Sequence, residues 1–422
     1  MIYIKVLIIL ITVFIIEICC QNKAKSLKPC RRKFIIVVDG GSTGTRLHFF
    51  EFKRMDNQIN LILTDKFSSK VALSKFSDAR AEWGLMRIMF NNLTSFAMSK
   101  IPKECFNNTP IYVQVTAGVR QINQAMSKKI LNHIRGILIK THFKFKSEFV
   151  GILSTNKEGL LAWISVNYLL GKFQSDKCLE TVGVLDLGGG STQIAFATVN
   201  ASFIKNCTKT ILFGQQYYVY SAGYDYMGIN EIRLKHFRAS KCFGSKCHNQ
   251  TMRSNCMHEN LTTNFYYGSM SLKVGGKPNL RSDRYNNCIV QSYNLISHVK
   301  QIRHTFWKMD FVAISAFYHI FRSVFHINIG DETDLKSYNV FKIFMYAVAN
   351  CQDPSKNTLN FRHFLCIDIA YVNSLISRGY GFDVSDDINI SISIKNISLS
   401  WALGFAISVL QSQLNELNDN SF

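Results

Sequence analysis

The sequence contains few prolines and no stretch of low complexity. Five of its 422 residues are proline, and no tract of repeated or biased composition divides the chain. Both absences argue against long flexible linkers. At 422 residues the chain is long enough to form two domains, and with 47% hydrophobic residues it can form a substantial core.

Other absences narrow the function. No CxxC spacing occurs among the 12 cysteines, which argues against a zinc site. No recognition motif for nucleic acid is present, and the lysines and arginines are spread along the chain rather than clustered. We therefore interpret the net charge of +21 mainly as a solvated basic surface, with attraction to nucleotides or other anions as the alternative.

The first 20 residues are typical of a secretory signal peptide. Val6–Ile16 is a largely apolar run of 11 residues, which is short for a membrane span. The alternative is an uncleaved signal anchor. No later stretch reaches 18 apolar residues, so we expect no stable membrane span after cleavage. We expect a monomer in the secretory pathway, either secreted or in the lumen of the endoplasmic reticulum or Golgi. Residues 418–422 are not a retention signal, and the sequence does not decide between these locations.

Cysteines and sequons fit the same compartment. Without Cys19 and Cys20 ten cysteines remain, an even number in a chain expected to enter an oxidising lumen. Candidate pairs are Cys242 with Cys247, Cys256 with Cys288, and Cys351 with Cys366, although sequence alone does not fix the connectivity. Eight Asn-x-Ser/Thr sequons predict a glycosylated surface: Asn92, Asn107, Asn200, Asn206, Asn249, Asn260, Asn389 and Asn396.

Two stretches share one pattern. Each is a β-rich apolar run that ends in an aspartate, turns through small residues and returns to β-rich residues. The aspartates are Asp39 and Asp186, 147 residues apart. The pattern predicts two β-hairpins. Glycines let backbone N–H groups approach an anion closely, and Ser and Thr hydroxyls add donors. Two matching loops suggest two related lobes that hold one phosphate chain, with a cation between the aspartates.

Strand-like and helical segments alternate, which predicts an α/β fold. We expect strands at 35–38, 47–52, 61–64, 111–116, 149–153 and 182–186, and helices at 79–100, 124–139, 160–170, 229–237, 340–350, 363–377 and 399–414. One lobe is predicted at residues 30–175 and the other at 176–397, with the C-terminal helix 398–415 returning to the first. The polar, Cys-rich residues 239–287 are interpreted as a surface excursion.

Cleavage of a terminal phosphate requires donors and a cation to offset the phosphoryl charge, and a base to activate water. The two loops supply the donors. Glu158 lies between a predicted strand and a predicted helix, where a carboxylate can point into a cleft, although alone it would be an ordinary first-turn residue. Ser191 and Gln193 could position a water against Glu158, although after glycines they are also plain turn residues.

Five segments, in order along the chain, resemble the apyrase or nucleoside triphosphate diphosphohydrolase family. They are Asp39–Arg46, Thr116–Arg120, Glu158–Trp163, Asp186–Gln193 and Ser400–Gly404, and the similarity spans about residues 33–412. The resemblance implies a two-lobed, actin-like (ribonuclease H-like) α/β fold with a central active-site cleft. It also implies hydrolysis of nucleoside di- and triphosphates to the monophosphate, with Ca²⁺ or Mg²⁺.

The same resemblance implies a role for each matched residue. Glu158 would be the base, Ser191 and Gln193 would hold the attacking water, and Thr116 and Arg120 would support the site. The metal would be bound through water by Asp39 and Asp186. Phosphates would be held by Gly41, Ser42, Thr43, Gly44, Thr45, Arg46, Gly188, Gly189, Gly190, Ser191, Thr192 and Trp401. The nucleobase would stack on Phe317, Tyr318, Tyr380 or Phe382, with core packing as the alternative for Phe317 and Phe382. His319 falls where the family often has tyrosine.

Gly44 and Arg46 resemble the soluble, endomembrane or secreted members that often prefer diphosphates such as UDP or GDP, with ADP and ATP as further substrates. Cys256/Cys288 and Cys351/Cys366 resemble two bridges of that branch. An exopolyphosphatase is the nearest enzymatic alternative, because it shares the fold but typically has glutamate at the position of Gln193. The alternative from another class is a secreted nucleotide-binding protein without turnover, and the intact set of Glu158, Ser191 and Gln193 argues against it.

Overall fold

The computed structural model describes residues 30–55, 58–77, 82–174, 180–238, 251–268, 270–278, 284–302, 309–325, 335–352 and 363–419. The predicted signal peptide, the candidate pair Cys242 with Cys247, and the sequon at Asn249 lie outside these ranges. Across the described ranges, no helix combines the length and the apolar character needed to cross a membrane.

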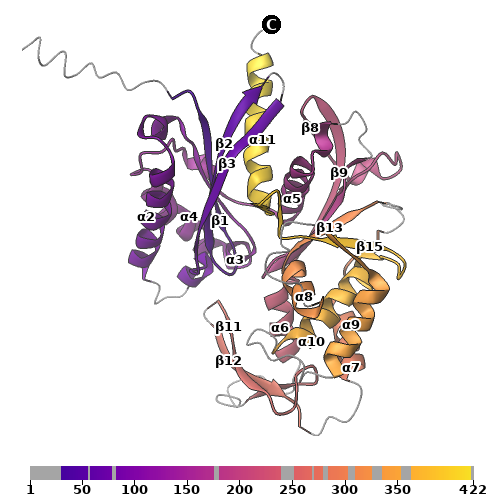
Figure 1. Cartoon of the computed structure of the whole chain (residues 1–422). Helices are drawn as coiled ribbons and strands as arrows, with labels where there is room; N and C mark the ends of the chain where they lie inside the picture. Colours follow the sequence, from indigo (N-terminus) through magenta and orange to yellow (C-terminus); the bar gives the residue numbers. More distant parts are fainter. Residues whose placement is uncertain are drawn as a thin grey trace, which may run out of the picture.

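A five-stranded sheet organises the N-terminal part of the chain (Figure 1). Its strands, in the order β3-β2-β1-β4-β5, are Gln58–Ser69, Thr45–Met55, Lys33–Gly40, Ile111–Val115 and Val150–Ile152. β1 and β2 form an antiparallel hairpin, as predicted for the first Asp-Gly loop, and β4 is parallel to β1. Residues 47–52 of β2 are all buried, on both faces of the strand, as expected of a sheet that is covered on both sides.

A seven-stranded sheet repeats this arrangement. Its strands, in the order β14-β15-β13-β6-β7-β9-β8, are Lys336–Asn339, Asp387–Ile390, Phe311–Ser315, Gly183–Leu187, Ser191–Ala197, Gln215–Asp225 and Thr208–Leu212. The series β9-β7-β6-β13-β15 has the same order and strand directions as β3-β2-β1-β4-β5. The second predicted hairpin, β6–β7, is therefore confirmed, and it occupies the place of β1–β2 in the first sheet.

Two helices lie between the sheets (Figure 1): α5 (Thr155–Leu169) and α11 (Trp401–Asp419). Their apolar side chains share one core with inward-facing residues of both sheets. The helices pack closely at Gly404, where an added Cβ would lie 1.9 Å from the carbonyl oxygen of Leu161. α5 packs against β6, β7 and β9, and α11 against β1 and β2. The lobe boundaries near residues 175 and 398 stay a prediction.

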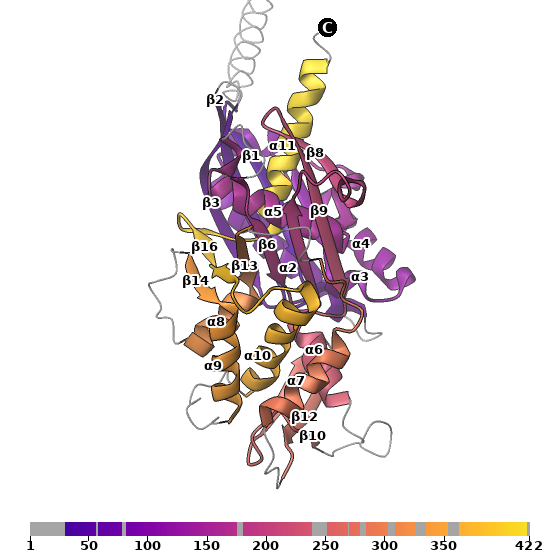
Figure 2. The ribbon, with the colours of Figure 1, turned by 90° about the vertical axis from the view of Figure 1, so that its right-hand side faces the viewer.

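Most of the other described helices pack on the outer faces of the two sheets (Figure 1), and Figure 2 shows those of the second sheet gathered below its strands. The first sheet carries α2 (Trp83–Lys100) and α4 (Gln124–Leu138), with the short helix α3 (Ala117–Arg120) after β4. The second sheet carries α6 (Ile229–Arg238), α7 (Arg284–Leu295), α8 (Ala316–Phe325), α9 (Val340–Gln352) and α10 (Leu365–Ser374). Helix α4 begins where the side chain of Asn123 accepts a hydrogen bond from the Met126 backbone N–H.

Residues 239–287, predicted to be a surface excursion, contain regular structure in their described part, where most residues of β10 and β11 are exposed or half-buried. That part forms a three-stranded sheet of β10 (Met252–Ser254), β12 (Met270–Gly276) and β11 (Thr262–Tyr267). Phe265 and Val274 are buried beneath it. The β11–β12 hairpin extends from the helices of the second sheet toward α3 (Figure 1). Apolar residues at alternate strand positions, diluted by polar neighbours, make this small sheet hard to recognise in the sequence.

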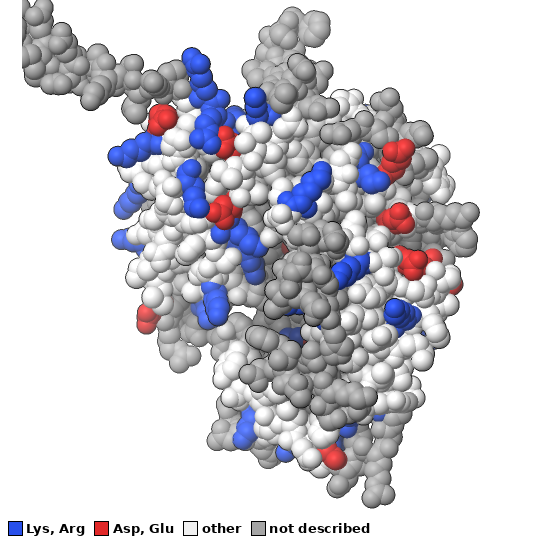
Figure 3. All heavy atoms as spheres, in the orientation of Figure 1, with Lys and Arg blue, Asp and Glu red and all other residues white. Residues whose placement is uncertain are grey.

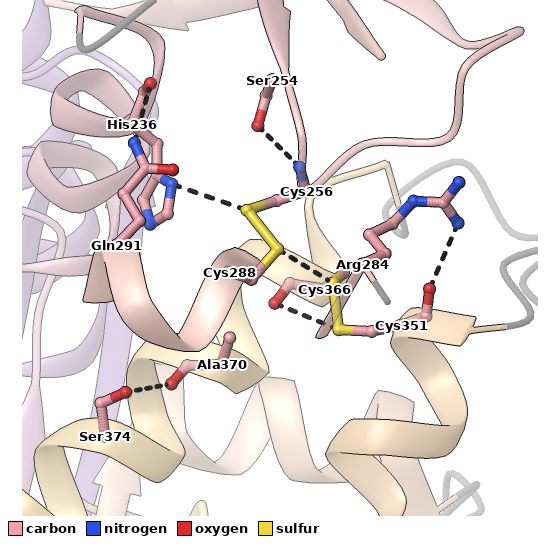
Figure 4. Close-up of a disulfide and its surroundings, with 10 residues drawn as sticks. All are labelled: His236, Ser254, Cys256, Arg284, Cys288, Gln291, Cys351, Cys366, Ala370 and Ser374. Carbon is pink, nitrogen blue, oxygen red and sulfur yellow. Dashed lines mark hydrogen bonds between the residues drawn. A yellow bond between two sulfur atoms is a disulfide. The ribbon is translucent and has the colours of Figure 1, made fainter. Parts of the chain in front are cut away.

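Three disulfides are formed among the described residues. Cys256–Cys288 and Cys351–Cys366 confirm two candidate pairs, and Cys30–Cys105 was not predicted. The first two disulfides lie against each other, with 3.5 Å between Sγ of Cys288 and Sγ of Cys366 (Figure 4). Together they tie β10, α7, α9 and α10 into one unit under the second sheet.

Sequons and basic residues lie at the surface. Six sequon asparagines have exposed side chains: Asn92, Asn107, Asn200, Asn206, Asn260 and Asn396. Lys and Arg are scattered over the face drawn in Figure 3 and interrupted by Asp and Glu, rather than gathered in one patch. This distribution favours the interpretation of the charge as a solvated surface on that face.

Candidate active site

A cavity of about 460 Å³ opens between the two large sheets, where β1 and β6 end. Both predicted loops line it. The residues of the predicted site that line the cavity are Asp39, Gly41, Ser42, Thr43, Arg46, Thr116, Glu158, Asp186, Gly188, Gly189, Gly190, Ser191 and Trp401. Residues from five separate segments of sequence therefore meet in one place.

The two hairpin loops face each other across this cavity. A Cβ at Gly189 would lie 2.6 Å from Ser42 Oγ and 2.9 Å from Thr43 Cγ2. A Cβ at Gly118 would lie 2.8 Å from the Cα of Ser42. A side chain at Gly189 would push the two loops apart, and one at Gly118 would push helix α3 away from the first loop, which explains glycine at both positions. The exposed backbone N–H groups of such loops can hold an anion.

Asp39 and Asp186 occupy equivalent ends of β1 and β6. In the antiparallel registers Asp39 lies opposite Arg46, and Asp186 lies opposite Gln193. Burial raises the pKa of each carboxyl to about 6, although the charge of Arg46 lowers that of Asp39. Arg46 Nη1 lies 3.5 Å from one carboxylate oxygen of Asp39, and the other oxygen, Oδ1, is buried without a hydrogen-bond partner in the described structure.

This arrangement fits a hard divalent cation. Carboxylate oxygens are the ligands that Mg²⁺ and Ca²⁺ prefer, and the orphaned Oδ1 of Asp39 offers such an oxygen. The described residues contain no group of three or more His, Cys, Asp or Glu side chains able to enclose a metal. A cation held by Asp39 and Asp186 would therefore need water or phosphate oxygens to complete its shell.

Glu158 lies in the first turn of α5, which begins where Ser154 accepts a hydrogen bond from the Lys157 backbone N–H. Its side chain is buried yet lines the cavity. Burial raises the pKa of Glu158 to about 8, against the lowering effect of the Arg120 charge. Arg120 Nη1 lies 3.3 Å from Glu158 Oε2. A buried carboxyl with a raised pKa is suited to accept a proton from water.

Arg120 connects Glu158 to the second loop. Its Nη2 donates a hydrogen bond to Ser191 Oγ at 3.3 Å and pairs with Asp225 Oδ1 at 2.8 Å. Gln193 Nε2 donates to the same Ser191 Oγ at 2.9 Å, and Gln193 Oε1 is buried without a described partner. The predicted base and the two predicted water-holding residues thus share one hydrogen-bond network that crosses between the sheets.

Four predicted site residues act from behind the cavity wall. Gly44 is needed because a Cβ there would lie 2.5 Å from the Ser69 carbonyl oxygen, and Thr45 Oγ1 donates to the Val71 carbonyl at 2.8 Å. Both therefore anchor the first loop to the chain after β3. Thr192 Oγ1 donates to the Asp186 carbonyl at 2.8 Å. Gln193 lies beneath Ser191, and none of the four is among the described residues that line the cavity.

The four aromatic residues predicted to hold the nucleobase lie in the core between the second sheet and its outer helices. Phe317 and Tyr380 have no exposed area, and Tyr318 and Phe382 are 3% and 5% exposed. In this arrangement none offers a free ring face to the cavity, whose described lining omits all four. Ala316 and His319 line it from α8 instead. Ala316 and His319 are three residues apart and share one face of the helix. Phe317, Phe321 and Val324 lie on the opposite, buried face, and this helical spacing can be read from the sequence.

Sequence reasoning missed other polar residues of the site. His48, Lys66, Asn230 and Ser398 line the cavity, and Asp225 pairs with Arg120. His48 could have been found, because residues two apart on a strand share a face and Arg46 already points into the cavity. Tyr267 of β11 forms side-chain hydrogen bonds with Ser42 and Glu231, and burial raises the pKa of its hydroxyl. Such contacts depend on the packing of remote strands and have no local signal.

Comparison with known proteins identifies the family. Human nucleoside diphosphate phosphatase ENTPD5 is 29% identical over 389 residues, which cover 89% of this chain and 87% of the relative. Human ectonucleoside triphosphate diphosphohydrolase 6 is 26% identical over 391 residues, covering 89% and 77%. A solved nucleoside triphosphate hydrolase structure from Neospora caninum superposes with a TM-score of 0.62 at 14% identity, covering 94% of this chain and 96% of that one.

A PPX-GPPA enzyme from Aquifex aeolicus has a TM-score of 0.50 at 12% identity, covering 89% of this chain and 99% of that one. At these identities the solved structures support the fold alone, and the predicted actin-like α/β fold is confirmed. The model of the GDA1/CD39 (nucleoside phosphatase) family matches residues 25–419. The chain therefore belongs to the GDA1/CD39 family of nucleoside phosphatases.

Proposed function

We propose that the protein hydrolyses the terminal phosphate of nucleoside diphosphates of the UDP and GDP type, with ADP and ATP as further substrates, in a reaction that depends on a divalent cation. The main support is that the buried Glu158 lines the same cavity as both glycine loops and both strand-end aspartates. The preference for diphosphates is supported by the similarity to human nucleoside diphosphate phosphatase ENTPD5.

In the proposed reaction Glu158 accepts a proton from a water held by Ser191 and Gln193. Arg120 keeps Glu158 and Ser191 in one network, so the base and the water are oriented together. The N–H groups and hydroxyls of the two loops bind the phosphoryl oxygens. The cation, Ca²⁺ or Mg²⁺, would be held through water by Asp39 and Asp186 and would offset charge on the phosphates.

The proposed setting is the secretory pathway, lumenal or extracellular. Three disulfides among the described residues and exposed sequons favour an oxidising, glycosylating compartment. Cleavage of a signal peptide and glycosylation belong to this proposal, and mass measurement of the mature protein tests both.

A substrate panel tests the activity. Phosphate release would be measured with UDP, GDP, ADP, ATP and inorganic polyphosphate, each with Ca²⁺, with Mg²⁺ and with EDTA. We expect release from nucleotides, fastest with diphosphates, and none with EDTA. Release from polyphosphate but not from nucleotides would favour an exopolyphosphatase. Nucleotide binding by calorimetry without any release would show a binding protein and overturn the proposal.

A further inference from the structure

Strand order places Lys66 and Glu158 at opposite ends of the cavity. Lys66 lies on β3 and Glu158 follows β5, whereas Asp39 lies on β1, the middle strand of the sheet. Neighbouring strands are about 4.8 Å apart, so β3 and β5 each lie on the order of 10 Å from β1, on either side. The cavity therefore has a Glu158 end and a Lys66 end, with the strand-end aspartates between them.

The second lobe follows the same direction. Arg120 bonds Ser191 and Asp225 at the Glu158 end, on β7 and β9. At the other end Lys66 Nζ donates a hydrogen bond to Ser398 Oγ at 2.7 Å, just before α11. Strand β13, which ends in Ser315, lies on the far side of β6 from β7. In both sheets, the strands that line the cavity are therefore ordered from the Glu158 network at one end to Lys66 at the other.

Lys66 is a cation without an acidic partner there. It lines the cavity, its side chain is exposed, and among the described residues no carboxylate forms an ion pair with it. Arg46, by contrast, pairs with Asp39. Lys66 is also fixed rather than free to leave the site, because Ser398 holds its ammonium group.

His48 lies directly opposite Lys66 in the β2–β3 register. Its ring is 6% exposed and lines the cavity, and its Nε2 atom has no described hydrogen-bond partner. Burial, and next the charges of Lys66 and Arg46, lower the pKa of His48 to about 3. The neutral imidazole of His48 is therefore buried beside the Lys66 ammonium, and its Nε2 atom is available to hydrogen-bond a polar ligand.

In-line displacement assigns a direction to the substrate. Water enters on one side of the phosphorus and the leaving oxygen departs on the opposite side. If the water is activated at the Glu158 end, the leaving oxygen points toward the Lys66 end. That oxygen belongs to the phosphate that stays on the nucleoside, and negative charge develops on it as the bond breaks.

We propose that Lys66 binds the phosphate that leaves with the nucleoside, with Ser398 holding its ammonium group and His48 forming the neutral wall beside it. The inference rests on the proposed function and adds a substrate-binding residue to it. Lys66 exchanges no proton and forms no covalent bond. Its charge is closest to the leaving phosphate, so the nucleoside monophosphate product should also depend on it.

Product inhibition tests this placement. Lys66→Gln removes the charge, Lys66→Arg keeps it, and Lys53→Gln removes an exposed charge from the same sheet outside the cavity lining. Phosphate release from UDP would be measured in the presence of UMP or of orthophosphate. For Lys66→Gln we expect about a tenfold rise in the inhibition constant of UMP and in the KM for UDP, because one charge-assisted hydrogen bond is lost. The inhibition constant of orthophosphate should change less than twofold.

Lys66→Arg should restore most of the UMP affinity, and Lys53→Gln should match the wild type. Unchanged UMP inhibition in Lys66→Gln, or an equal rise for UMP and orthophosphate, would overturn the inference. Failure of the wild type to release phosphate from any nucleotide would instead overturn the proposed function. In that case calorimetric titration with UMP still tests Lys66, because binding of the monophosphate requires no turnover.

Discussion

Replacing Glu158 with Gln should lower activity and raise stability, and the two effects share one cause. The carboxyl is buried among Arg120, Asp39 and Asp186, and its pKa is raised from 4.5 to about 8. The folded protein therefore binds this proton more tightly than the unfolded chain. Protonated Glu158 therefore adds to the free energy of unfolding. This contribution is fully present below about pH 4.5 and is lost as the pH rises toward 8.

The magnitude follows from the shift. Each pKa unit corresponds to about 1.4 kcal/mol, so a shift of roughly 3.5 units predicts that ionising Glu158 costs the folded state about 5 kcal/mol at pH 9. Glutamine occupies the same volume and does not ionise. Arg120 keeps Asp225 as its partner in the variant. Without a carboxylate, proton abstraction from water is lost, which typically lowers the rate 10²–10⁴-fold.

Two assays separate these effects. Thermal unfolding of the wild type and Glu158→Gln would be followed at pH 5 and pH 9 with EDTA, which keeps cations from binding the acidic cluster. We expect similar midpoints at pH 5 and a higher midpoint for the variant at pH 9. Phosphate release with cation present should fall at least 100-fold. Glu148→Gln, at an exposed site near β5, should change neither measurement.

The outcome that contradicts this reasoning is specific. If Glu158→Gln is less stable than the wild type at pH 9, the buried carboxylate is stabilised by its surroundings rather than strained by them. If turnover stays within tenfold of the wild type, another group activates the water.

Three further predictions concern close contacts and the cation. Gly118→Ala should raise KM at least tenfold, because its Cβ would lie 2.8 Å from the Cα of Ser42 and displace the first loop; steady-state phosphate release measures this. Gly404→Ala should lower the free energy of unfolding by roughly 1–3 kcal/mol or more, because its Cβ would lie 1.9 Å from the Leu161 carbonyl oxygen. Gly136→Ala in helix α4 should raise it by about 0.5–1 kcal/mol, because the new Cβ would meet nothing within 4 Å. Denaturant unfolding of the two variants measures both effects. EDTA should abolish turnover and added Ca²⁺ or Mg²⁺ should restore it; metal-independent release would refute the cation bridge between the strand-end aspartates.

Local patterns were sufficient for the parts of the site that depend on backbone shape. An aspartate at a strand end, followed by glycines and hydroxyl residues, specifies both a hairpin and an anion-binding turn, and both hairpins are present at Asp39 and Asp186. Glu158 is predicted just before a helix at 160–170; the helix begins earlier, at Thr155, so Glu158 lies in its first turn. These features can be predicted because the turn conformation and the helix start are set by neighbouring residues.

Contacts between remote strands were not predictable in the same way. Asp225 and Lys66 reach the site through the registers of β9 and β3, which depend on the packing of whole sheets. The predicted base-stacking rings illustrate a different limit. For Phe317 the residue type leaves base stacking and core packing both open, whereas helical spacing places it on the buried face of α8. An aromatic residue near a cleft is more readily used as core than as a ligand surface.

Under the proposed function, the repeated sheets give a nearly symmetric framework two unequal halves. Asp39 and Asp186 occupy equivalent positions, but their cross-strand partners differ: Arg46 faces the first and Gln193 the second. The charged partner favours phosphate, and the neutral partner, which bonds Ser191, favours water. At the Glu158 end the charge of Arg120 is paired with Glu158 and Asp225. Lys66 lies on β3, next to the strand of Arg46, and extends a cationic wall away from Ser191 and Gln193. Under the proposed function, the direction of cleavage follows from this difference between the two hairpins together with Glu158 and Lys66, which lie outside them.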